Sequence, residues 1–190
     1  MRLKFAVLAA APALLLGAAI PRGAAKEDPT NNLRLVADLS DKRLKMFEAD
    51  TLVWQYPISD GTAGYPTPAG EYRIRKLIWN PRWTPPPNSE WARKYKPQAP
   101  GSSANPMKVV KIFFREPDYY IHGTGDTASL GTAASHGCLR MDPDQAAEVG
   151  AIVMEHGGSA FGWDWIKRLL HIGETRTVRL KQPVTLRVDY

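Results

Sequence analysis

The chain has 190 residues, a formal net charge of +6 and 44% hydrophobic residues. That length is enough to bury the core of one domain. No run of lysine or arginine is long enough to indicate nucleic-acid binding. The mild positive charge suits a negatively charged partner, such as an anionic surface or a substrate that carries carboxylates.

Residues 1–25 have the pattern of a cleavable signal peptide. Arg2 and Lys4 form a basic start, residues 5–20 are apolar, and small residues at 23–25 precede Lys26. The apolar run is shorter than the roughly 20 residues of a membrane span, and a proline and a glycine interrupt it. An uncleaved anchor helix is the alternative. We expect export to the periplasm or cell wall and no membrane segment after processing.

The mature chain would therefore begin near Lys26 and carry a net charge of +3, because the leader holds three basic residues and no acid. Its first part predicts a meander of short strands, since apolar residues alternate with polar ones and turn-forming residues separate the runs. The predicted strands cover residues 33–39, 44–46, 52–58 and 71–79.

Residues 80–106 contain seven prolines. They cannot form a continuous helix or a central strand, because proline lacks an amide donor and restricts the residue before it. A linker is one interpretation, but Trp83, Trp91 and Tyr95 are costly side chains in a solvated linker. We favour a long insertion that packs over the domain and borders a binding cleft.

Strand character returns after the insertion. Branched and aromatic residues predict strands at 108–114 and 118–122. Two terminal strands are expected at 177–180 and 184–188. The chain contains no internal repeat, so we expect one domain over residues 26–190.

The clearest helix follows Asp142, which is placed to cap it. Pro143 fits its first turn, and Gly157 is placed to end it. A second, short amphipathic helix is expected near residues 163–171.

Cys138 is the only cysteine in the chain. In an oxidising compartment it cannot form an internal disulfide, so it is buried and inert, paired with another molecule, or a free thiol with a function. Gly137 allows a tight turn and a close approach by a substrate, and nearby amides can point to one spot. An acyl-transfer site needs a nucleophile, a base and oxyanion donors, and this segment can supply the nucleophile and the donors.

The base would be a histidine, because a free thiol with a pKa of about 8.5 is mostly protonated at neutral pH. His122 ends a predicted strand, and a loop of small residues can bring it to Cys138. His136 is so close in sequence that its backbone shapes the turn. For His156 and His171 we expect helix-end and surface roles.

Residues 121–141, IHGTGDTASLGTAASHGCLRM, resemble the signature of the YkuD-type L,D-transpeptidases. Residues 60–74, DGTAGYPTPAGEYRI, resemble the Thr-Pro-x-Gly segment of that family, and WNPRWTPP with the later NPM is similar to its proline-rich insertion. The resemblance runs from Leu33 to Tyr190. It implies an α+β fold in which two mixed β-sheets pack as a sandwich with one main helix.

The resemblance also implies a mechanism. Cys138 would attack the peptide bond between the L-centre of a diamino acid and the terminal D-residue of a peptidoglycan tetrapeptide stem. His122 would be the base, with its ring oriented by the carbonyl of Gly123. The amides of His136, Gly137 and Cys138 would stabilise the oxyanion. The D-residue leaves, a thioester remains, and an amine of a second stem forms a cross-link, with no metal or organic cofactor.

Two other positions have open roles. Arg140 either holds a substrate carboxylate or fixes the turn through a salt bridge to Asp142 or Asp144. Ser135 is expected to form local hydrogen bonds and not to react. Lys108 stands where the family pattern has glycine, which leaves the path of the insertion undetermined.

The same residues allow other interpretations. A zinc site of His122, His136 and Cys138 lacks a fourth ligand and the usual spacing. A papain-like protease has its cysteine before its histidine. The same thioester could be resolved by water, giving an L,D-carboxypeptidase, or by the amine of a cell-wall-linked protein. A non-catalytic wall-binding module would not need both His122 and Cys138.

Overall fold

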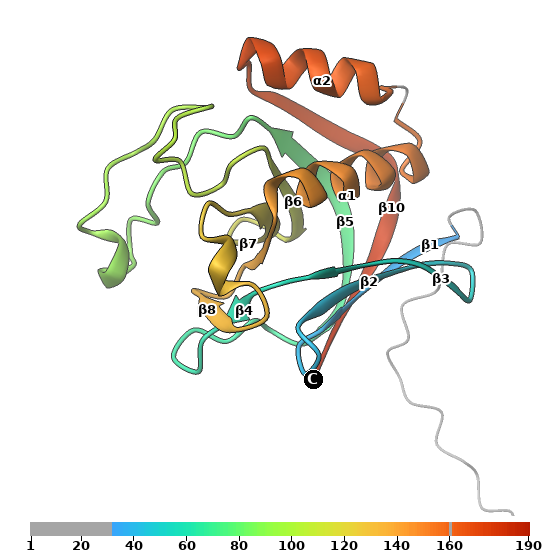
Figure 1. The fold of residues 1–190 in the computed structure, drawn as a ribbon, viewed down its shortest axis with the longest axis horizontal. Coiled ribbons are helices and arrows are strands. Elements are labelled where there is room, and N and C mark those ends of the chain that lie inside the picture. The colour runs from blue at the N-terminus through green and yellow to red at the C-terminus, as the bar shows by residue number, and fades with distance from the viewer. Residues whose placement is uncertain (1–31, 160) are drawn as a thin grey trace, which may run out of the picture.

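The computed structural model describes residues 32–159 and 161–190, so the predicted signal peptide and its cleavage site lie outside the described residues. The fold is α+β (Figure 1). Its elements are, in chain order, β1 (Leu33–Asp38), β2 (Arg43–Glu48), β3 (Thr51–Pro57), β4 (Asp60–Gly61), β5 (Gly70–Trp79), the 3-10 turn η1 (Glu90–Ala92), β6 (Val110–Arg115), β7 (Tyr119–Gly123), the 3-10 turn η2 (Thr127–Ser129), β8 (Ala133–Ser135), β9 (Leu139–Met141), α1 (Pro143–His156), α2 (Trp163–Ile172) and β10 (Arg176–Asp189).

Eight of these strands form one mixed sheet in the order β3-β2-β1-β10-β5-β6-β7-β9, and β4 and β8 form a second, two-stranded sheet. β10 pairs in parallel with β1 and antiparallel with β5. In Figure 1 the long strands β5 and β10 connect the half made by β1 to β3 with the half made by β6, β7 and β9. Both halves contribute to one hydrophobic core. The predicted α+β fold with mixed sheets is confirmed.

Helix α1 begins and ends where the sequence predicts. The carboxylate of Asp142 accepts hydrogen bonds from the amides of Asp144 and Gln145, at 2.9 and 3.3 Å, and so caps the helix. The helix contacts β6, β7 and β10 and buries its apolar face against the sheet, where the indole of Trp79 donates to the sulfur of Met154 at 3.0 Å. The second predicted helix is α2.

The strand predictions were wrong in two places. The two expected terminal strands are one strand, β10, whose register shifts between Arg179 and Val184. Pro183 lacks an amide donor and interrupts the ladder there, but the chain stays extended. The short strands β4, β8 and β9 were not predicted, because two or three residues are too few to show an alternating pattern.

The segment 80–106 is packed and is not a solvated linker. Trp83 is buried, and it exchanges two backbone hydrogen bonds with Gln98, at 3.0 and 2.8 Å. The side-chain amide of Asn105 donates to the carbonyls of Pro81 and Ala99 at 2.8 and 3.0 Å. In Figure 1 this connection extends to the left of the sheet.

Lys108 follows the insertion and has φ of +49°. This φ lies in the left-handed region, which favours glycine. The lysine keeps the turn, and its ammonium donates to the carbonyl of Ser103 at 2.9 Å.

Candidate active site

The register of β6, β7 and β9 brings the candidate residues together. Lys111 pairs with His122, and His122 pairs with Arg140. Residues directly opposite each other share one face of a sheet, so these three side chains form a row across three strands. Tyr120 lies two residues before His122 in β7, which places it on the same face, and Cys138 immediately precedes β9, two residues before Arg140. All five residues line one cavity.

Cys138 is half-buried, and its thiol donates a hydrogen bond to the carbonyl oxygen of Asp118 at 3.2 Å. Burial raises the pKa of the thiol to about 11. Hydrogen bonds with Tyr120 and the positive charge of Lys111 oppose this rise but do not cancel it. The thiol is therefore protonated at neutral pH and needs a base before it can react.

His122 is buried, and its Nδ1 lies 2.7 Å from the carbonyl oxygen of Gly123. A carbonyl only accepts, so Nδ1 carries the proton and Nε2 of the neutral ring is left with a lone pair. Burial lowers the pKa of His122 to about 3, and the nearby charge of Arg140 acts in the same direction. The ring is therefore neutral at neutral pH and can accept a proton at Nε2.

The contact with Gly123 is the one that the family resemblance implies. The thiol and the imidazole are both neutral in the resting site, so an attack by sulfur would require its proton to be transferred to a base. The catalytic roles of the two residues remain predictions.

Buried hydrogen bonds fix the turn that carries Cys138. Thr67 Oγ1 accepts from the amide of Gly61 at 2.9 Å and donates to the carbonyl of Gly137 at 3.0 Å. Ser135 Oγ donates to the carbonyl of Cys138 at 2.6 Å and accepts from the amide of Gly137 at 2.9 Å. Ser135 thus bonds locally, as predicted, and Thr67 ties the Thr-Pro segment to the turn that carries Cys138.

The same contacts correct one part of the expected oxyanion hole. Because the amide of Gly137 already donates to Ser135 Oγ, it is not a free donor for a substrate oxygen. The proposed donors are therefore reduced to the amides of His136 and Cys138.

Replacing Gly137 with alanine is expected to disturb the turn. Gly137 has φ of +104°, and an added Cβ would lie 2.8 Å from a ring carbon of Tyr119. We expect the free energy of unfolding to fall by about 2–3 kcal/mol, as measured by urea denaturation. Gly131→Ala is the matched control, because Gly131 has φ of +90° but nothing within 4 Å of an added Cβ. Equal losses in the two variants would show that the contact with Tyr119 does not matter.

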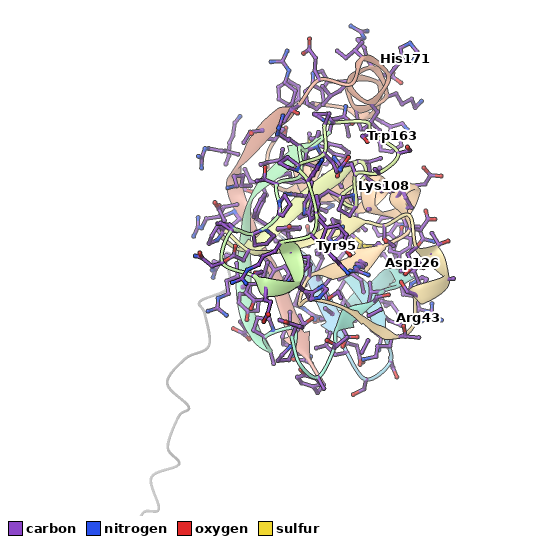
Figure 2. The ribbon with its side chains drawn as sticks, turned by 90° about the vertical axis from the view of Figure 1, so that its left-hand side faces the viewer. Arg43, Tyr95, Lys108, Asp126, Trp163 and His171 are labelled. Carbon is purple, nitrogen blue, oxygen red and sulfur yellow. The ribbon has the colours of Figure 1, made fainter. Side chains whose placement is uncertain are left out.

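The cavity above Cys138 has a volume of about 810 Å³. Part of its wall comes from the insertion, including Trp83 and Trp91. The ring of Trp91 stacks on the exposed ring of His136 with centroids 3.9 Å apart and an interplanar angle of 14°. Figure 2 shows Tyr95 of the insertion together with Lys108 and Asp126, three residues that line this cavity. The insertion therefore borders the site.

Arg140 forms no ion pair with any residue within 32–159 or 161–190. The salt bridge to Asp142 or Asp144 considered from the sequence is therefore wrong. Asp142 caps α1 instead, and Arg140 lines the cavity. This leaves its guanidinium available for a carboxylate.

Sequence reasoning missed Lys111 and Tyr120. A signal for Tyr120 was present, because it lies two residues before His122 in a strand and so faces the same side. Lys111 stands alone as a charge within the apolar run VVKIFF. A single lysine in such a strand must face solvent, a partner or a cavity.

The other histidines lie outside the site. His156 ends α1, where its Nε2 lies 3.6 Å from a carboxylate oxygen of Glu48, and His171 is exposed in the last turn of α2, as predicted.

No three His, Cys, Asp or Glu side chains form a metal-binding group in the described part of the chain, so His122, His136 and Cys138 are not arranged as a zinc site. Within the same residues, no helix is long and apolar enough to cross a membrane.

Comparison with known proteins agrees with the geometry of the site. Residues 32–158 match the YkuD family, described as the L,D-transpeptidase catalytic domain. The chain belongs to this family. The match includes Cys138, His122 and the insertion, and it ends before α2 begins.

Curated relatives of the chain carry the L,D-transpeptidase name. The chain is 29% identical over 120 residues to the YkuD family member of Bacillus licheniformis, covering 63% of this chain and 59% of the relative. It is 34% identical over 122 residues to a family member from the ATP synthase gene region of Fuscovulum blasticum, covering 60% and 61%. The chain thus spans about three-fifths of the length of these relatives.

A solved L,D-transpeptidase from Mycobacterium smegmatis has the same fold. It matches with a TM-score of 0.52 and 16% identity, over 84% of this chain and 59% of that one. At this identity the likeness concerns the fold alone.

Proposed function

We propose that this protein is an exported peptidoglycan L,D-transpeptidase with Cys138 as its nucleophile. The observation that carries the proposal is that a half-buried cysteine and a neutral, buried histidine line one cavity, in a chain of the L,D-transpeptidase catalytic-domain family. Export is supported by the pattern of residues 1–25, and the catalytic domain would extend over 26–190.

The reaction follows from the protonation states. Nε2 of His122 removes the thiol proton while Sγ of Cys138 attacks the carbonyl carbon of the diamino residue in a tetrapeptide stem. The oxyanion receives hydrogen bonds from the amides of His136 and Cys138. The C–N bond then breaks, the imidazolium gives its proton to the leaving D-amino acid, and a thioester remains.

The second half of the reaction restores the thiol. An amine of a second stem attacks the thioester carbon, His122 takes a proton from that amine, and the C–S bond breaks. Sulfur regains the proton and a cross-link between two diamino residues is released. Water as the acceptor would make the protein an L,D-carboxypeptidase, and the amine of a cell-wall-linked protein would give covalent attachment to the wall.

Mass spectrometry of tetrapeptide muropeptides incubated with the purified protein tests this proposal. We expect new dimers joined through two diamino residues, and loss of the terminal D-residue from the donor. The control is protein whose thiol has been blocked with iodoacetamide. Tripeptide without dimers would point to the carboxypeptidase, and unchanged tetrapeptide would refute both activities.

A further inference from the structure

Lys111 and Arg140 flank His122 on the floor of the cavity, one strand away on each side. Lys111, like Arg140, forms no ion pair with any other described residue. Its ammonium lies 4.7 Å from the centre of the Tyr120 ring, and burial lowers its pKa. Apart from this aromatic contact, Lys111 has no counter-ion to replace the hydration that its charge loses on burial.

Lys76 is another lysine that contacts an aromatic ring, and its contacts can be compared with those of Lys111. Its ammonium lies 4.2 Å from the centre of the Phe113 ring, and it also forms an ion pair with Glu116. Lys111 has the aromatic contact but no acid. The two acids that line the cavity, Asp118 and Asp126, are exposed and form no ion pair with it. The nearby thiol of Cys138 is protonated in the resting site and so supplies no negative charge, which leaves a ligand as the source of a counter-ion for Lys111.

Strand geometry fixes the spacing of the two cations. Neighbouring strands lie about 4.8 Å apart, so the α-carbons of Lys111 and Arg140 are about 10 Å apart with His122 between them. His122 and Cys138 mark the position of the reacting carbonyl. Carboxylates bound by Lys111 and Arg140 would therefore lie on opposite sides of that carbonyl.

We propose that Lys111 binds a second carboxylate of the donor peptide, on the other side of the scissile bond from the carboxylate that Arg140 binds. The preferred donor then carries one carboxylate on the leaving residue and one on the half that becomes the thioester. This inference rests on the proposed function for the identity of the donor, but the anion site itself can be tested without it.

The first test compares alkylation of Cys138 by iodoacetate and by iodoacetamide. Both reagents react with the thiolate, so a change in the pKa of the thiol alters both rates equally and leaves their ratio unchanged. The ratio therefore measures how strongly the site attracts the negatively charged iodoacetate. In Lys111→Met we expect the iodoacetate-to-iodoacetamide ratio to fall by about three- to tenfold. Lys111→Arg should keep the ratio, because it keeps the charge.

Lys167→Met is the control for net charge. Lys167 is exposed on α2 and is not among the residues that line the cavity, so the ratio should not change. Should Lys111→Met fail to fold, Lys111→Gln makes the same test. A ratio that does not change on loss of the Lys111 charge would overturn the anion site.

The second test uses donor peptides in which one or the other carboxylate is converted to a carboxamide. For the intact donor, Lys111→Met should raise KM about tenfold, a larger effect than the change in kcat that follows from the loss of its charge near Cys138. For the donor that lacks the carboxylate bound by Lys111, the Lys111→Met variant should show no such rise in KM. The Arg140→Met variant should show no rise in KM only for the donor that lacks the other carboxylate. Equal losses on every donor would refute the assignment of Lys111 to a second carboxylate. If no donor reacts but the alkylation ratio falls, the proposed function fails and the anion site stands.

Discussion

Replacing Cys138 with alanine is expected to lower acyl transfer by at least about 10⁴-fold, because no other side chain in the cavity can form the thioester. Whole-protein mass spectrometry after mixing with a tetrapeptide donor gives the measurement. The intact protein should gain the mass of the donor minus its terminal D-residue. The alanine variant should gain nothing, and the serine variant serves as a control of similar size.

The fold should survive this change. Alanine loses the hydrogen bond of the thiol to the carbonyl of Asp118 and its hydrogen bonding with Tyr120, but the turn is held by Thr67 and Ser135 through backbone atoms that alanine keeps. We expect the free energy of unfolding to change by about 1 kcal/mol or less. Release of the terminal D-residue by a folded alanine variant would refute Cys138 as the nucleophile, and loss of folding together with activity would assign it a structural role.

Much of the fold follows from patterns that the sequence displays directly. Alternation at Leu33, Leu35 and Ala37 predicts β1, and these three side chains are buried. Asp142 and Gly157 mark the ends of α1 because capping is local chemistry. The joining of two expected terminal strands into β10 was not visible, because Pro183 looks like a break and only pairing with β1 and β5 keeps the chain extended.

Only the part of the site that depends on residues close together in the sequence was predicted. Cys138, His122 and the Gly123 contact lie within one continuous motif, and the distance of 2.7 Å between Nδ1 and the carbonyl agrees with it. Lys111 is outside that motif and reaches the site only through the register of β6 against β7. The engagement of the Gly137 amide by Ser135 depends on the local path of the turn, which composition and spacing do not determine.

Replacing His122 with asparagine is expected to lower kcat/KM about 10³- to 10⁴-fold at pH 7. A thiol with a pKa of about 11 is ionised in about one molecule in 10⁴ at that pH, so the reaction depends on the base. Asparagine keeps a donor for the carbonyl of Gly123 but has no basic nitrogen. The variant therefore separates the loss of the base from the loss of the hydrogen bond that orients it.

The pH dependence of the two proteins should differ in a defined way. In the variant the rate should rise about tenfold for each pH unit towards pH 11, because the thiolate then forms without a base. In the intact protein the pKa of His122 is about 3, so the ring stays neutral and no loss of activity is expected between pH 7 and pH 5. Initial rates of D-residue release over pH 5–10 measure both profiles. A variant whose rate does not depend on pH, or an intact protein that loses half its activity near pH 6.5, would show that burial does not keep His122 and Cys138 neutral as the structure indicates.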